Sequence, residues 1–131
     1  IKKLEEGNLF DAWGGIAGLQ FTLPVIWTEG KKRGLSLEKM ISLLTSKPAK
    51  FLGLENRKGK LKKGFDADIT IWNENDEFIV AENMIEHKHK ATPYLNHKLK
   101  GKIIHTFVNG VQVVEKSAMK KMNAGELLLN K

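Results

Sequence analysis

Apolar residues in the first part of the chain recur at spacings of three and four, which predicts helices. The first predicted helix covers residues 17–33. Pro24 is compatible with its first turn, where the missing N–H costs no bond, and Gly34 is a candidate left-handed cap. The repeat is formed by Leu19, Leu23, Ile26 and Gly30.

Two shorter helices are expected next. Ser36 is a candidate N-cap for a helix whose apolar stripe consists of Leu37, Met40, Ile41 and Leu44. A third helix is expected to begin at Ser46 and Pro48. We expect the apolar side chains of these helices to form core, including Phe51, Leu52 and Leu54 around Gly53.

After Leu54 the pattern changes from helical to β. Residues 55–64 are charged and contain two glycines, which indicates a turn-rich connection. Two short β-branched and aromatic runs, 69–72 and 78–80, predict strands separated by a polar turn at 73–76.

A hairpin is predicted farther along the chain. Residues 103–108 and 111–114 alternate and flank Asn109-Gly110, the preferred pair for a type I′ turn. In this register Val108 faces Val111 and Thr106 faces Val113. The sequence thus predicts helices first and then a small β unit, with the Lys-rich tail from 116 unassigned.

The composition and charge of the chain limit the classes of partner that it could bind. The chain of 131 residues carries a formal charge of +7, but only Arg33 and Arg57 are arginines, and the lysines are interleaved with acids. Arginine is favoured for base and phosphate recognition, so we expect no nucleic-acid partner. There is no cysteine, no run long enough for a membrane span and no signal-peptide pattern. Because the first Met is Met40, we expect the C-terminal part of something larger.

The segment Asp11–Gln20 is the most distinctive part of the chain. Trp13 is followed by three glycines within five residues, a composition typical of backbone that approaches a ligand closely. The segment therefore predicts a substrate loop. No nucleophile, metal cluster or acid–base pair accompanies it in the sequence.

Two polar pairs are candidates for a chemical site. His87 and His89, two apart, could share a metal ion, but no third ligand converges and two lysines adjoin, which favours surface histidines. Asp66 and Asp68 precede a strand, which favours bonds to nearby turn backbone over acid–base catalysis. His97 and His105 are isolated, and His105 is expected to be a structural partner in its strand.

Three separated motifs carry a family resemblance. Ala12–Gln20, Lys58–Trp72 and the ending Thr92–Val114 together resemble the C-terminal third of the cyclic amidohydrolases. The Trp-Gly-Gly loop resembles the allantoinase branch, whereas hydantoinases and dihydropyrimidinases carry an Asn-Gly-rich loop there. The resemblance covers about residues 2–115.

The resemblance implies an α/β fold, the C-terminal part of a TIM-barrel metal-dependent hydrolase. Residues 1–54 would be the last barrel loop and its helices. Residues 55–115 would be returning strands of a small composite β-sandwich, and 116–131 an unassigned tail. The segments around Asp66 and His87 would then lie away from the chemistry.

The reaction that the resemblance implies is hydrolysis of the cyclic amide of allantoin to allantoate. The family carries it out at a centre of two divalent metal ions, usually zinc. The resemblance places no catalytic residue and no metal ligand in this segment. It leaves the backbone of Trp13, Gly14 and Gly15 to hold the substrate ring, at the C-terminal face of a barrel. The segment alone is expected to be inactive.

Several alternatives remain open at this point. The parent protein could be a hydantoinase or dihydropyrimidinase, or a non-enzymatic scaffold relative that has lost its ligands. The family implies a homo-oligomer, a tetramer when complete. The compartment is undetermined between cytosol, peroxisome and mitochondrion, since residues 128–131 are not a peroxisomal ending.

Overall fold

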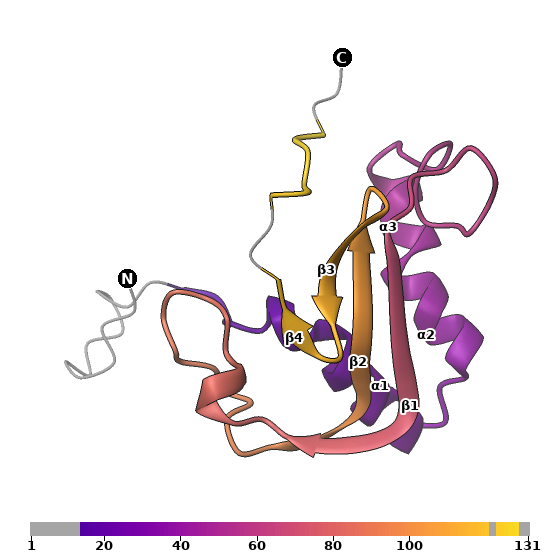
Figure 1. Cartoon of the computed structure of the whole chain (residues 1–131). Coiled ribbons are helices and arrows are strands. Elements are labelled where there is room, and N and C mark those ends of the chain that lie inside the picture. Colours follow the sequence, from indigo (N-terminus) through magenta and orange to yellow (C-terminus); the bar gives the residue numbers. More distant parts are fainter. Residues whose placement is uncertain (1–13, 121–122, 129–131) are drawn as a thin grey trace.

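The computed structural model describes residues 14–120 and 123–128, and consists of a helical segment followed by one antiparallel sheet (Figure 1). The helical part contains a 3-10 turn, η1 (Leu19–Phe21), and three helices: α1 (Thr22–Lys32), α2 (Leu37–Leu44) and α3 (Ser46–Phe51). The sheet has the order β1-β2-β3-β4. Its strands are β1 (Ile69–Ile79), β2 (Lys98–Val108), β3 (Val111–Glu115) and β4 (Ala118–Met119), with a 3-10 turn, η2 (Glu82–Met84), between β1 and β2.

The predicted helices are confirmed, with a later start for the first. The predicted helix 17–33 is η1 followed by α1, with Pro24 in the first turn of α1. Its end is a Schellman motif: Leu35 N–H bonds to the Gly30 carbonyl at 2.9 Å and Gly34 N–H to the Lys31 carbonyl at 3.1 Å. Gly34 has the left-handed conformation that this motif requires, with φ of 72°. Within the described ranges, every helix is too short or too polar to cross a membrane.

The N-cap of α2 is also confirmed. The Ser36 hydroxyl accepts a hydrogen bond from Lys39 N–H at 3.3 Å. Met40 is completely buried, whereas Ile41 from the same predicted stripe is 41 % exposed.

The expectation that every helical apolar residue belongs to the core is wrong. Leu19 is 91 % exposed, Phe51 89 % and Leu52 56 %. In α3 the buried residue is the small Ala49. Periodicity located the helices, but it could not tell which residues of each helix are buried.

The predicted turn at 73–76 is wrong, because β1 runs through it without a break. Asn73 pairs with Lys102 and Glu77 with Lys100, so residues 74–76 of β1 lie opposite the single residue Gly101. The extra residues form a bulge, and both long strands bend in this region (Figure 1). Within the bulge, Asn73 Oδ1 accepts a hydrogen bond from Asn75 N–H at 3.0 Å.

The predicted β2–β3 hairpin is confirmed, with one error in its register. Asn109 and Gly110 have φ of 48° and 79°, as the primed turn requires, and Val108 pairs with Val111. Thr106 pairs with Val114 and not with Val113, because Val113 is an extra residue in a bulge. The tail from 116 that the sequence left unassigned contributes β4, which pairs with β3.

The core lies between η1, α1 and the sheet. Phe21, Val80, Ile85 and Leu99 form its buried cluster. Beside it, the indole rings of Trp27 and Trp72 meet edge to face at 5.8 Å.

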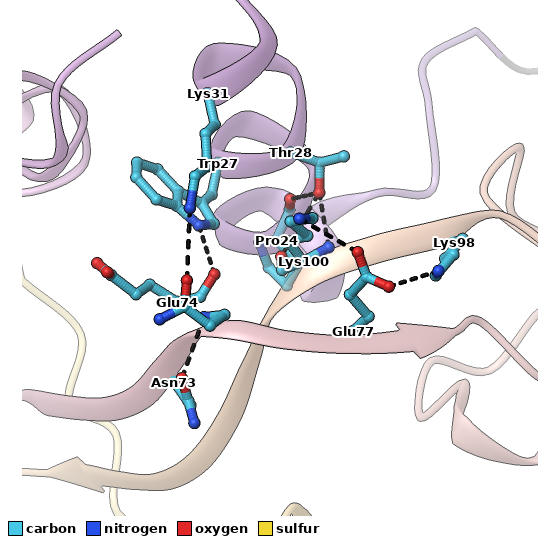
Figure 2. A network of polar contacts seen from close by, with 10 residues as sticks. Pro24, Trp27, Thr28, Lys31, Asn73, Glu74, Glu77, Lys98 and Lys100 are labelled. Carbon is cyan, nitrogen blue, oxygen red and sulfur yellow. Dashed lines mark hydrogen bonds and ion pairs between the residues drawn. The ribbon is translucent and has the colours of Figure 1, made fainter. Parts of the chain in front are cut away.

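Polar contacts fix α1 on the two long strands (Figure 2). Trp27 Nε1–H donates to the Glu74 carbonyl at 2.9 Å, in the bulge. The buried Thr28 hydroxyl donates to the Pro24 carbonyl at 2.6 Å and accepts from Lys100 N–H at 2.8 Å. Side chains of α1 therefore join the helical part of the chain directly to the sheet.

Candidate functional site

The predicted substrate loop, Asp11–Gln20, is called the glycine loop below. Its described part begins at Gly14. Trp13 falls outside the described residues, whereas Gly14 and Gly15 are both exposed. A Cβ built on Gly14 meets no atom of the described residues within 4 Å, and Gly15 has a φ of 93°, which a residue with a side chain adopts only with strain. Residues 14–120 and 123–128 therefore leave the space beside the Gly14 Cα open.

The segment that follows, 16–20, forms tight turns leading into α1. Gly18 N–H bonds to the Ile16 carbonyl and Phe21 N–H to the Gly18 carbonyl, both at 2.9 Å. Both bonds join residues close together in the sequence, so they do not attach this segment to the rest of the molecule.

Attachment comes from the connection between β1 and β2, which curls beside the segment entering α1 (Figure 1). Gln20 Nε2–H donates to the Met84 carbonyl at 2.6 Å, and Gln20 Oε1 accepts from Glu86 N–H at 3.0 Å. The Thr92 hydroxyl donates to the Ala17 carbonyl at 2.7 Å. Sequence reasoning included Gln20 and Thr92 in motifs but did not foresee these contacts between the two segments.

The two histidines 87 and 89 lie between these contacts. Glu86 and Thr92, on either side of the pair, both contact residues 17–20, so this connection borders the glycine loop rather than lying remote from it. His89 is exposed, and the His87 Nε2 atom is buried with no hydrogen-bond partner in the described part of the chain.

The described residues supply no metal centre. No group of three or more His, Cys, Asp or Glu side chains among residues 14–120 and 123–128 is arranged to hold a metal ion. These residues therefore do not fit a binuclear centre, and we assign no metal ligand and no metal-dependent step to them.

Asp66 and Asp68 have structural partners, as predicted, but these are mainly cations of the preceding connection, with which they form an ion-pair network, rather than nearby turn backbone. Lys58 Nζ lies 2.9 Å from Asp66 and also contacts Asp68, and Arg57 lies 2.8 Å from Asp66. Asp68 Oδ1 accepts from Asn109 N–H at 2.9 Å, in the β2–β3 turn. The network ties the 55–66 connection to the hairpin.

The ion pairs of this network shift the pKa values of its members. The pKa of Lys58 is raised, mainly by its hydrogen bond to Asp68. The bond from Lys58 lowers the pKa of Asp66, with help from Arg57. Partial burial pushes the pKa of Asp68 upward, but the bonds from Lys58 and Asn109 N–H outweigh it and the net shift is downward.

The remaining histidines have structural surroundings. His105 lies in β2 with its Nδ1 atom 3.0 Å from Gln112 Nε2, which confirms the expected role. His97 is exposed and meets Tyr94 edge to face at 6.3 Å.

Comparison with known proteins gives consistent results. The sequence model of the Amidohydrolase family matches residues 7–114. A probable allantoinase of Oryza sativa is 41 % identical over 133 residues, covering all of this chain and 26 % of the rice protein. The allantoinase of Arabidopsis thaliana is 42 % identical over 112 residues, 84 % of this chain and 22 % of the plant protein.

The solved structures agree on the fold. The L-hydantoinase of Arthrobacter aurescens superimposes with a TM-score of 0.77 at 32 % identity, covering 86 % of this chain and 25 % of that chain. Such neighbours are TIM-barrel amidohydrolases, a family that uses binuclear metal centres. This chain spans about a quarter of the length of the relatives it matches. The order of its elements and the match over residues 7–114 lead to one conclusion: the chain belongs to the amidohydrolase family.

Proposed function

We propose that this chain is the part of an allantoinase that supplies the substrate loop, in a protein that hydrolyses the cyclic amide of allantoin to allantoate. The observation that carries the proposal is the Trp13-Gly14-Gly15 loop, found in a chain that is 41–42 % identical to plant proteins named as allantoinase or probable allantoinase. In this proposal backbone amides of the loop hold the substrate ring. The open space beside Gly14 supports it.

The proposal divides the chain as its sequence suggests. Residues 1–54 belong to the end of the barrel and 55–115 to the composite β-sandwich. In the tail 116–131, Ala118–Met119 add β4 to the sheet, and the other residues have no assigned role. In our proposal the two divalent metal ions are zinc, and their ligands are residues of the whole protein outside Ile1–Lys131. The residue that acts as the catalytic acid and base also lies outside this range. A homo-tetramer is expected for the whole protein.

The test is a chimera in which this chain replaces the corresponding segment of the Arabidopsis thaliana allantoinase. We expect the chimera to hydrolyse allantoin in preference to hydantoin and dihydrouracil. Preference for hydantoin or dihydrouracil would instead favour the hydantoinase alternative, to which the 32 % identity with the Arthrobacter aurescens enzyme gives weight. A folded, metal-loaded chimera that hydrolyses none of the three would contradict the proposal.

Gly14→Val probes the loop itself. A Cβ at this position lies more than 4 Å from the atoms of the described residues, so we expect folding to be unaffected while the close approach of substrate is blocked. We expect KM to rise or turnover to be abolished. Gly125→Val is a matched control, because Gly125 is also exposed with nothing within 4 Å. Unchanged kinetics in Gly14→Val would remove the loop from the site.

A further inference from the structure

The contacts between the glycine loop and the β1–β2 connection are long-range and specific. Ala17 and Thr92 are 75 residues apart, and Gln20 lies 64 and 66 residues from its two partners. All three contacts fix segment 17–20, directly after the exposed glycines.

The Gln20 side chain acts as a two-point bracket. Its amide donates to one carbonyl and accepts from one N–H of the same short segment, Met84–Glu86, as a neighbouring strand would. Two antiparallel bonds from one planar amide fix its orientation as well as its distance. Gln20 is half-buried, so these bonds are partly shielded from water.

Thr92 and Tyr94 hold the loop from the other end of the connection. The Thr92 hydroxyl satisfies the Ala17 carbonyl at 2.7 Å. The Tyr94 ring lies so close to Gly18 that a Cβ there would be 2.8 Å from Cε2. The Tyr94 ring also meets the ring of Phe21 edge to face, with 6.5 Å between their centroids, which joins this contact to the buried core cluster.

We propose that Gln20, Thr92 and Tyr94 are positioning residues, through which segment 84–94 holds the glycine loop in its substrate-binding geometry. The inference rests on the proposed function, because it takes the backbone of Gly14 and Gly15 as the binding group. Ala17 is three residues from Gly14, so a displaced Ala17 carbonyl moves those amides. Displacements near 1 Å are enough to weaken a well-aligned site by large factors.

The central test is Thr92→Val in the chimera, which removes one donor and keeps the shape of the side chain. We expect hydrogen exchange of amides 14–20 to become faster and KM for allantoin to rise roughly 2- to 12-fold, the range set by one net hydrogen bond. The value of kcat should change less than KM. Thr92→Ser, which keeps the hydroxyl, should restore both readouts.

Thr70→Val is the matched control, since Thr70 is an exposed threonine of β1. It should leave loop exchange and KM unchanged. If Thr92→Val does not fold, Gln20→Met carries the same test, because it removes the bracket and keeps most of the side-chain volume.

The outcomes separate the two proposals. Unchanged exchange and unchanged KM in folded Thr92→Val would overturn the positioning role. Faster exchange with unchanged KM would overturn the link between this loop and substrate. If the unsubstituted chimera hydrolyses no cyclic amide, the proposed function fails, and the exchange rates alone decide whether segment 84–94 holds the loop.

Discussion

Single residues determine where the two long strands and α1 can approach one another. Gly101 is the clearest case, because it lies opposite the β1 bulge with a φ of 93°. A Cβ there would lie 2.9 Å from Trp72 Cζ3 and 3.2 Å from Trp27 Cδ1. The edge-to-face contact of the two indoles therefore depends on the missing side chain.

We predict that Gly101→Ala destabilises the protein by about 2–5 kcal/mol, the sum of left-handed strain and overpacking. Gly34→Ala is the matched control: Gly34 also has a positive φ, but nothing lies within 4 Å of its Cβ position. It should cost only about 1–2 kcal/mol. Denaturant unfolding of both chimeras measures the difference, and equal losses would show that the clash at Gly101 is relieved.

Sequence reasoning at this scale succeeded where a residue acts through its own backbone. Ser36, Gly34 and the Asn109-Gly110 pair were assigned correctly, because caps and primed turns depend on local geometry. It failed at Asn73, whose turn-forming side chain serves a bulge in a continuous strand. Only the partner strand β2 decides between a turn and a bulge.

Outside the backbone pairing of the strands, several elements are joined by side chains that reach a backbone group of another element. Trp27 and Thr28 connect α1 to β1 and β2, and Asp68 connects the start of β1 to the hairpin turn. The prediction of separate helical and β parts did not include these contacts. Their partners are 41–72 residues away in sequence, beyond what local patterns specify.

The ion-pair network at Lys58 predicts a pH dependence. Because the carboxyl pKa values of Asp66 and Asp68 are lowered, their contribution to stability is present above about pH 4 and is lost as pH falls through the lowered values. Because the pKa of Lys58 is raised, its contribution is present below about pH 10 and is lost above the raised value.

We therefore expect Lys58→Met to lower the melting temperature most between about pH 5 and 9, with the difference from the unsubstituted chimera shrinking toward pH 2. Lys32→Met is the control, since Lys32 and its partner Glu29 are 66 % and 50 % exposed. It should change the melting temperature little. A Lys58→Met difference that is the same at every pH would show that the network contributes nothing electrostatic.

At the scale of the whole molecule, the described residues expose several large apolar side chains to solvent. Leu61 is 82 % exposed and Leu127 88 %, in addition to Leu19 and Phe51. Such surface favours association in water.

We predict that isolated Ile1–Lys131 associates at micromolar concentration and shows no cooperative melt as a monomer. Sedimentation and calorimetry on the same sample would check this, and the chimera, with its larger fold, is the control. A sharp, reversible melt of a monomer would contradict the prediction.

At this scale the family was predictable from sequence, but the support of the candidate site was not. The motifs of residues 12–20, 58–72 and 92–114 identified the family, since each has a characteristic order of residues. That Thr92 holds Ala17 depends on the path of the connection in space. The substrate role of Trp13, Gly14 and Gly15 stays a prediction.

The distance along the chain between Ala17 and Thr92 has a consequence for biosynthesis. A ribosome adds about 5–20 residues per second, so Thr92 is made roughly 4–15 s after Ala17. Throughout that interval the glycine loop exists without its support, while α1 can already form from local contacts. The loop therefore cannot acquire its final conformation until Thr92 has been made, and a truncation before Thr92 would leave the loop without this support.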